Sequence, residues 1–247
     1  MARVSDFYSY IDSFAPFSSQ EEWDNSGFLV GEADREVTAV TVCLDVTEEV
    51  IRQAADNGCE LIVSHHPVIF NAQKSITDRN PAYLCARLGI SVISAHTCYD
   101  FAFGGVSDIL AEAAGLKNIR KSVSGEFTLG ETDCETAEEL AKKVKSALGC
   151  EIQLCLKGKN VNTVGVCGGA GSDFVLDARN EGADAFLTGE AKHHEFLDAV
   201  QNGISLICAG HFETEIISVM PLAKRLQEHF GTVKVFTARE KSPIEHI

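Results

Sequence analysis

The chain has 247 residues, of which 45% are hydrophobic and 23% charged, a composition typical of a globular protein rather than a disordered or fibrous one. Its 21 basic and 36 acidic side chains give a net charge of −15. This acidity argues against nucleic acid or an anionic membrane as the main partner, because phosphate groups are bound by clustered Lys and Arg. No apolar run approaches the roughly 18 residues of a membrane span, and the start of the chain lacks the apolar segment of a signal peptide.

The first predicted element is an amphipathic helix, on which Val4, Phe7, Ile11 and Phe14 share one face. Between residues 38 and 114, apolar strands alternate with helices, which predicts βαβ units around a mostly parallel sheet. The last of these helices, in GGVSDILAEAAG, is predicted to be capped by Ser107.

The character of the sequence changes near residue 124, so we predict two α/β domains, residues 1–124 and residues 125–247. The second begins with a β-α-β segment, whose helix starts at the capping box Thr136–Glu139 and whose closing strand is EIQLCLKG. Strands and helices then alternate again, and the final helix is predicted to be interrupted at Pro221. The tail KVFTAREKSPIEHI is expected to form a strand that packs back on the first domain.

Nine cysteines occur without a CxxC pair, and most lie within apolar runs such as TVCLD and ISLICAG. We expect them to be reduced, buried side chains of a cytoplasmic protein rather than a disulfide framework or a zinc ribbon.

Four apolar runs, each opened by a glycine, end at residues that can bind a metal. The runs lead from Gly58 to His65 and His66, from Gly89 to His96, from Gly182 to Glu190, and from Gly203 to His211. Each spacing corresponds to a helix end, a strand and the residue just past the strand. Ligands of open parallel sheets bind outside the carboxyl ends of the strands, so this pattern predicts a site there.

Adjacent residues at a strand end point apart, so His65 and His66 can serve two metals, or one can bind a metal while the other supports its ligands. A polar turn is the alternative. Asp100 is a hard oxygen ligand or a partner that orients a histidine, with an ordinary turn residue as the alternative. His211 and Glu215, four residues apart at the start of a helix, share one face. Three histidines and two carboxylates are enough for two divalent ions that activate a water.

Three further motifs have two interpretations each. Glu190, with His193 and His194, forms either a cluster that shuttles protons, contacts the substrate or orients the metal ligands, or an ordinary acidic first turn of a helix. The glycines of VGVCGGAGSDF either present N–H groups to a phosphate or make a tight turn into a helix opened by Ser172. Trp23, the only tryptophan, either lines a pocket or packs in the core.

Six motifs in this order resemble the Nif-three-like family (Ngg-one-interacting factor three), whose bacterial members carry the label GTP cyclohydrolase I type 2 homolog. The motifs are WDNSGFLVG, LDVTEEV, LIVSHHPVIF, SAHTCYD, TGEAKHH and AGHFETE. The resemblance implies two α/β domains with a dinuclear metal site between them, and a ring-shaped homohexamer. It implies as ligands the five residues that the spacing also favours: His65, His66, Asp100, His211 and Glu215.

His96 and Glu190 match family positions near the site but outside its ligand set, and we assign them catalytic roles in moving protons. The chain departs from the family at Cys98 and Tyr99, where Asn-Leu is usual after His-Thr, which raises the question of a metal contact by Cys98.

The first functional hypothesis is a metal-dependent hydrolase that acts on a nucleotide or a related small molecule through an activated water. A GTP cyclohydrolase-type reaction is the named candidate, and phosphoester hydrolysis is a rival because paired metals suit in-line displacement. The second hypothesis is a metal-containing interaction, metal-handling or regulatory protein without turnover. A DNA-binding regulator is the weakest hypothesis, opposed by the net charge of −15. Zinc is the first choice of metal, and iron or manganese would also suit these ligands.

Overall fold

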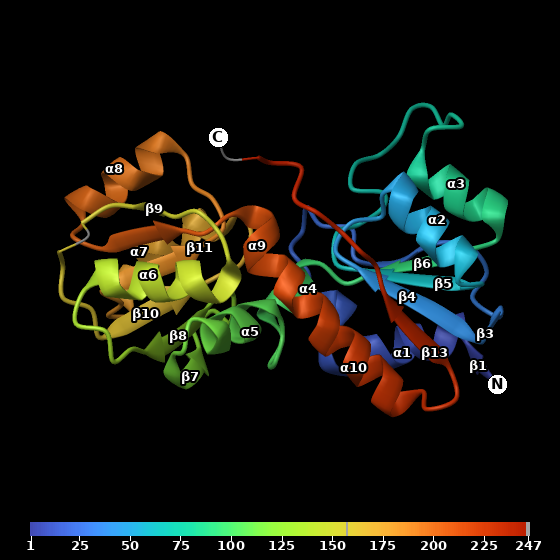
Figure 1. Ribbon diagram of the computed structural model, residues 1–247, viewed down its shortest axis with the longest axis horizontal. Coiled ribbons are helices and arrows are strands. Elements are labelled where there is room, and N and C mark those ends of the chain that lie inside the picture. Colours follow the sequence, from blue (N-terminus) through green and yellow to red (C-terminus); the bar gives the residue numbers. More distant parts are fainter. Residues whose placement is uncertain (157, 246–247) are drawn as a thin grey trace. The chain divides into compact units, whose positions relative to one another are not determined.

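The computed structural model describes residues 1–156 and 158–245, which form two compact units. The first unit comprises residues 1–102 and 219–241, and the second comprises residues 103–218 and the chain from Ser242 on. Each unit has its own sheet with helices, so the mixed α/β class expected from the sequence is confirmed (Figure 1). The predicted strand EIQLCLKG and the predicted tail extend beyond the described residues at Lys157 and at residues 246–247, respectively.

The first unit is organised by a five-stranded sheet in the order β13-β4-β5-β6-β2. Its strands are β2 (Gly27–Val30), β4 (Ala39–Cys43), β5 (Leu61–Ser64), β6 (Ser91–Ser94) and β13 (Lys234–Thr237). Strands β13, β4, β5 and β6 run parallel, and β2 pairs antiparallel with β6 at one edge. A separate ribbon pairs β1 (Ala2–Arg3) with β3 (Glu36–Val37). The parallel sheet aligns the carboxyl ends of β4, β5 and β6 along one edge.

Helices cover both faces of this sheet: α2 and α3 lie on one face, and α1 and α10 on the other (Figure 1). The helical elements of the unit are α1 (Val4–Phe14), the 3₁₀ turn η1 (Phe17–Ser19), α2 (Glu48–Asp56), α3 (Pro81–Leu88), α4 (Thr97–Phe101) and α10 (Val219–His229). Thr47 and Asn80 cap α2 and α3, each accepting a hydrogen bond from a first-turn N–H. All four residues of β5 are buried, as expected for a central parallel strand.

The second unit has a six-stranded sheet in the order β7-β8-β10-β11-β12-β9. Its strands are β7 (Lys117–Lys121), β8 (Thr128–Glu131), β9 (Gln153–Leu154), β10 (Thr163–Val166), β11 (Ala185–Thr188) and β12 (Ser205–Cys208). Strands β10, β11 and β12 are parallel, and antiparallel strands flank them on both sides. Its helical elements are α5 (Val106–Ala113), α6 (Ala137–Leu148), η2 (Gly171–Phe174), α7 (Val175–Asn180), α8 (His193–Gln201), α9 (His211–Glu215) and η3 (Ile216–Ser218).

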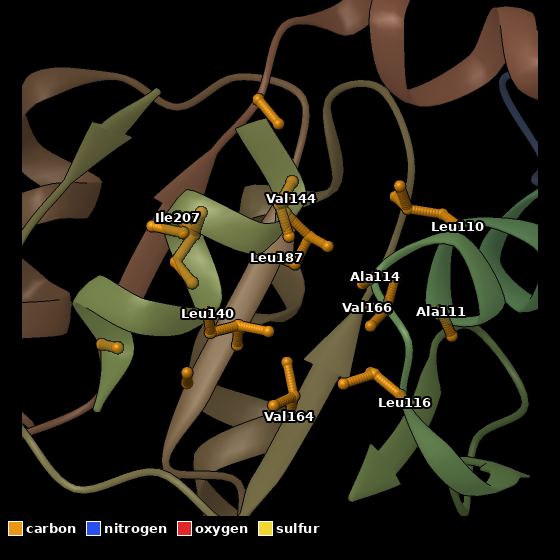
Figure 2. Close-up of a cluster of buried hydrophobic side chains, with 14 of the residues drawn as sticks. Leu110, Ala111, Ala114, Leu116, Leu140, Val144, Val164, Val166, Leu187 and Ile207 are labelled. Atoms are coloured by element: carbon orange, nitrogen blue, oxygen red, sulfur yellow. The ribbon is translucent and has the colours of Figure 1, made fainter. Parts of the chain in front are cut away.

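Alternate residues of the central strands face two separate cores in this unit. On one face, Leu140 and Val144 of α6 and Leu110 of α5 pack against strand residues that include Val164 and Leu187 (Figure 2). On the other face, α7 and α8 cover a second cluster, formed by Val175, Ala178, Phe186, Ala199 and Leu206. This two-residue alternation is why the strands read as continuous apolar runs in the sequence.

Three boundaries differ from the sequence-based predictions. The units divide after Ala102 rather than near residue 124, because α5 packs on β8 and β10 and β7 pairs with β8. The predicted cap at Ser107 is wrong, since α5 already begins at Val106 and Ser107 lies buried in its first turn. The predicted break at Pro221 is also wrong. The chain bends through η3 instead, and Pro221 occupies the first turn of α10, where a missing N–H is tolerated.

No helix among the described residues is long and apolar enough to span a bilayer.

Candidate metal centre

In the first unit, three imidazoles meet at the carboxyl ends of β5 and β6. His65 and His66 directly follow β5, and His96 follows β6 by two residues. Their candidate ligand atoms all lie within 4.8 Å of one another, and their ring centroids are 5.1 to 5.5 Å apart. The strand-exit pattern in the sequence therefore corresponds to a cluster in space that could hold a metal ion.

His65 is held in one tautomer by its backbone neighbour. Its Nδ1 lies 2.9 Å from the carbonyl oxygen of Ala95, and a carbonyl can only accept a hydrogen bond. Nδ1 therefore carries the proton, and a neutral His65 has its lone pair on Nε2. That atom lies 3.5 Å from Oδ1 of Asp100, and both side chains are buried. An imidazole anchored through Nδ1 beside a buried carboxylate is a typical metal-ligand pair.

His66 and His96 are anchored in the same way by carboxylates. Nδ1 of His66 lies 2.8 Å from Oδ1 of Asp45, and Nδ1 of His96 lies 2.8 Å from Oδ1 of Asp24. In each case Nε2 becomes the nitrogen able to bind a metal or exchange a proton with a ligand.

Asp24 is a fixed negative charge beneath His96. Its side chain is completely shielded from solvent, and it accepts hydrogen bonds from the backbone and the hydroxyl of Thr97 and from the hydroxyl of Ser26. Burial by itself would raise the pKa of this carboxyl, but the hydrogen bonds from His96 and Thr97 hold its pKa well below the usual range. Asp24 is therefore ionised at neutral pH and orients the imidazole.

The Asp45 carboxylate is positioned by the returning C-terminal chain. Both oxygens of Glu240, three residues after β13, accept 2.8 Å hydrogen bonds from the backbone N–H groups of Leu44 and Asp45. Burial raises the pKa of Glu240, although those two hydrogen bonds oppose the effect. The loop that holds His66 is thereby tied to the last strand of the sheet.

In the second unit, His211 and Glu215 occupy one face of the short helix α9. Nε2 of His211 lies 3.2 Å from Oε2 of Glu215, and its Nδ1 lies 3.1 Å from Oε1 of Glu190. The Glu215 side chain is 3% exposed, whereas that of Glu190 is 57% exposed. A carboxylate thus holds Nδ1 of His211, as for His66 and His96, and its Nε2 faces a buried carboxylate, as for His65.

The glycine turn after β10 gives Glu215 its space. A Cβ on Gly169 would stand 2.0 Å from Oε1 of Glu215, and φ at this residue is +57°. The Gly169 N–H donates to Oγ1 of Thr214, and its carbonyl accepts from the N–H groups of Gly189 and Glu190. Because these groups are used within the unit, they favour the tight-turn interpretation over a phosphate cradle.

The other candidate residues from the sequence lie in two different environments: the two histidines of α8 are exposed, and Cys98 is buried. His193 and His194 are exposed at the start of α8, where His194 lies 3.9 Å from Glu195. Cys98 is fully buried in α4, and burial raises the pKa of its thiol to about 12, so it remains protonated.

Sequence reasoning missed Asp24 and Asp45 as partners of the histidines. Asp45 could have been found, because it follows β4 just as the histidines follow β5 and β6.

The profile of the family described as Duf34/NIF3 (NGG1p interacting factor 3) matches residues 2–243, which confirms the resemblance inferred from the motifs. A Campylobacter jejuni protein named GTP cyclohydrolase 1 type 2 homolog is 34% identical over 251 residues, which cover 99% of each chain. A Helicobacter pylori protein named GTP cyclohydrolase 1 type 2 is 33% identical, over 87% of this chain and 88% of its own. The Schizosaccharomyces pombe protein NIF3 homolog is 34% identical, over 79% of this chain and 78% of its own.

Two solved structures share the fold. A Staphylococcus aureus hypothetical protein superimposes with a TM-score of 0.92 at 27% identity, covering 99% of each chain. A Bacillus cereus protein related to NIF3 gives a TM-score of 0.91 at 21% identity, covering 100% of this chain and 99% of its own.

Proposed function

Because the chain belongs to the Duf34/NIF3 family, we propose that it is a metal-dependent hydrolase acting on a nucleotide or a related small molecule. The observation that carries the proposal is the common anchoring of four imidazoles. Nδ1 of His65, His66, His96 and His211 each faces an oxygen of the chain, which commits Nε2 to ligand chemistry. Histidines that serve only to pack have no need for this shared orientation.

In the proposed centre, two divalent ions would be held by His65, His66, Asp100, His211 and Glu215. The fit rests on donor chemistry, since imidazole nitrogens and buried carboxylates suit zinc, our first choice, and also iron or manganese. Two such ions would lower the pKa of a bound water and polarise the group it attacks.

His96 and Glu190 are the residues we assign to proton movement. Asp24 holds Nδ1 of His96, so Nε2 is the atom through which His96 would pass a proton to or from the substrate. Glu190 contacts Nδ1 of His211, and its exposed carboxylate is also accessible to water. The Helicobacter pylori relative, named GTP cyclohydrolase 1 type 2, supports GTP as the first substrate to assay. Phosphoester hydrolysis is the rival reaction within this proposal.

Elemental analysis and turnover test the proposal together. We expect two metal ions per chain, with His211→Asn lowering metal content and abolishing GTP turnover. His194→Asn is the matched control, because that histidine is exposed in the same unit. Metal-loaded protein that leaves both GTP and a panel of nucleotide phosphoesters unchanged would refute the hydrolase assignment.

A non-catalytic interaction or metal-handling role is the second candidate, favoured by the family description as an interacting factor. Partner capture by Glu215→Gln separates the two functions: binding that persists after metal is lost supports the interaction role.

We also propose a homohexamer, which native mass spectrometry would identify, and a cytoplasmic location, which suits the seven buried free thiols.

A further inference from the structure

Two large aromatic rings are left exposed beside the histidine cluster of the first unit. Trp23 is 59% exposed and Phe70 is 46% exposed, and their ring centroids are 5.9 Å apart with the ring planes tilted by 50°. Trp23 precedes β2, and Phe70 lies in the loop between β5 and α3. Neighbouring exposed aromatic rings often mark a binding surface.

The two loops are tied together and to His96. The side-chain amide of Asn25 donates a 2.6 Å hydrogen bond to the carbonyl of Ile69, next to Phe70. Asp24, next to Trp23, holds Nδ1 of His96. The fixed network on which the imidazole depends therefore also positions both rings.

Both rings meet His96 at similar distance and angle. The Trp23 and Phe70 centroids lie 5.9 and 6.0 Å from the His96 centroid, with interplanar angles of 74° and 76°. On its other side, His96 is 5.2 Å from His65 and 5.5 Å from His66, again between centroids. A flat group stacked on Trp23 or Phe70 would thus have one edge beside an imidazole that adjoins two candidate metal ligands.

We propose that Trp23 and Phe70 form a platform for the planar nitrogen heterocycle of the substrate, a purine-like ring, with His96 at its polar edge. The inference rests on the proposed function and narrows its substrate class, because a simple phosphoester without a ring would not use this surface. The aromatic faces provide stacking area, and the edge provides a hydrogen-bonding nitrogen, so the surface suits a ligand that is flat and polar at its rim.

Trp23 is the only tryptophan, so its fluorescence reports directly on the platform. Guanosine and GTP, added with excitation at the red edge of the indole absorption, are expected to quench it saturably. Tripolyphosphate and ribose 5-phosphate are expected not to. Phe70→Ala should weaken guanosine binding by about fivefold to 150-fold, the range for losing one stacked aromatic, and Phe70→Tyr should restore it. Tyr83→Ala, an exposed aromatic on α3, is the matched control and should bind normally.

Three results would overturn the platform. One is quenching by tripolyphosphate equal to that by GTP, and another is no quenching by any of these probes. The third is a Phe70→Ala variant whose oligomeric state changes while guanosine affinity stays constant, since the rings would then serve contact with a second copy. The titration is repeated on chelator-treated protein, and metal content is measured separately. A protein without bound metal that still binds guanosine would count against the metal centre alone. A protein with bound metal that does not bind guanosine would count against the platform alone.

Discussion

Replacing Gly169 by alanine is expected to displace Glu215, one of the ligands of the proposed metal centre. The new Cβ would stand 2.0 Å from Oε1 of Glu215 and 3.2 Å from Nε2 of His211. The turn is anchored through its own N–H and carbonyl, as described above, so the carboxylate is the group that moves.

The expected decrease in the free energy of unfolding of Gly169→Ala has two parts. Alanine in the left-handed region, at φ of +57°, costs about 1–2 kcal/mol. Separating the buried Glu215 carboxylate from His211 adds about 1–3 kcal/mol. We therefore expect Gly169→Ala to lower the free energy of unfolding by about 2–5 kcal/mol. Gly149→Ala isolates the first part, because Gly149 has φ of +67° and no atom within 4 Å of its added Cβ.

Urea unfolding of chelator-treated protein measures the stability difference, and elemental analysis of the metal-loaded variants measures occupancy. We expect Gly149→Ala to retain its metal and Gly169→Ala to lose it. If Gly169→Ala were no less stable than Gly149→Ala and kept the wild-type metal content, the idea that this turn positions Glu215 would be wrong.

Three other substitutions test hydrogen bonds and core packing elsewhere in the two units. Glu60→Gln should cost about 1 kcal/mol near neutral pH, because the carboxylate accepts hydrogen bonds from the backbone of residues 38 and 39. Although burial opposes the effect, these bonds lower the pKa of Glu60 below its usual range, so the stability gap to wild type should close as pH falls through the lowered pKa. A constant gap in urea titrations would contradict this. Glu240→Ala leaves two backbone N–H groups without their acceptor and should cost about 2–4 kcal/mol, whereas Glu228→Ala, on the exposed side of α10, should be near neutral in the same assay. Leu140→Ala should cost about 2–5 kcal/mol in thermal or urea unfolding and Leu176→Ala, which is 41% exposed, far less; similar losses would show that the α6 core is not as packed as described.

The central strands and the histidine cluster could be predicted because one physical rule governs both. Parallel strands buried on both faces read as short apolar runs, and the residue after each run lies at the same edge of the sheet. His65, His66 and His96 followed this rule, and the structure places them together.

The partners of these histidines were harder to predict because their positions depend on tertiary contacts. Asp24 reaches His96 across 72 residues of sequence, from a turn with no periodic pattern. Glu240 reaches the Asp45 loop across 195 residues. The boundary near residue 124 failed for a related reason: strand β7 is exposed and charged, and only its pairing with β8 assigns it to the second unit.

The return of β13 to the first sheet has a consequence for biosynthesis. When a ribosome has translated as far as residue 218, every strand of the second sheet has been made, yet the first sheet still lacks the neighbour of β4. The first unit therefore cannot finish folding until β13 has emerged from the ribosome. The unit encoded in the middle of the gene can mature earlier, which reverses the usual order in which domains fold during translation.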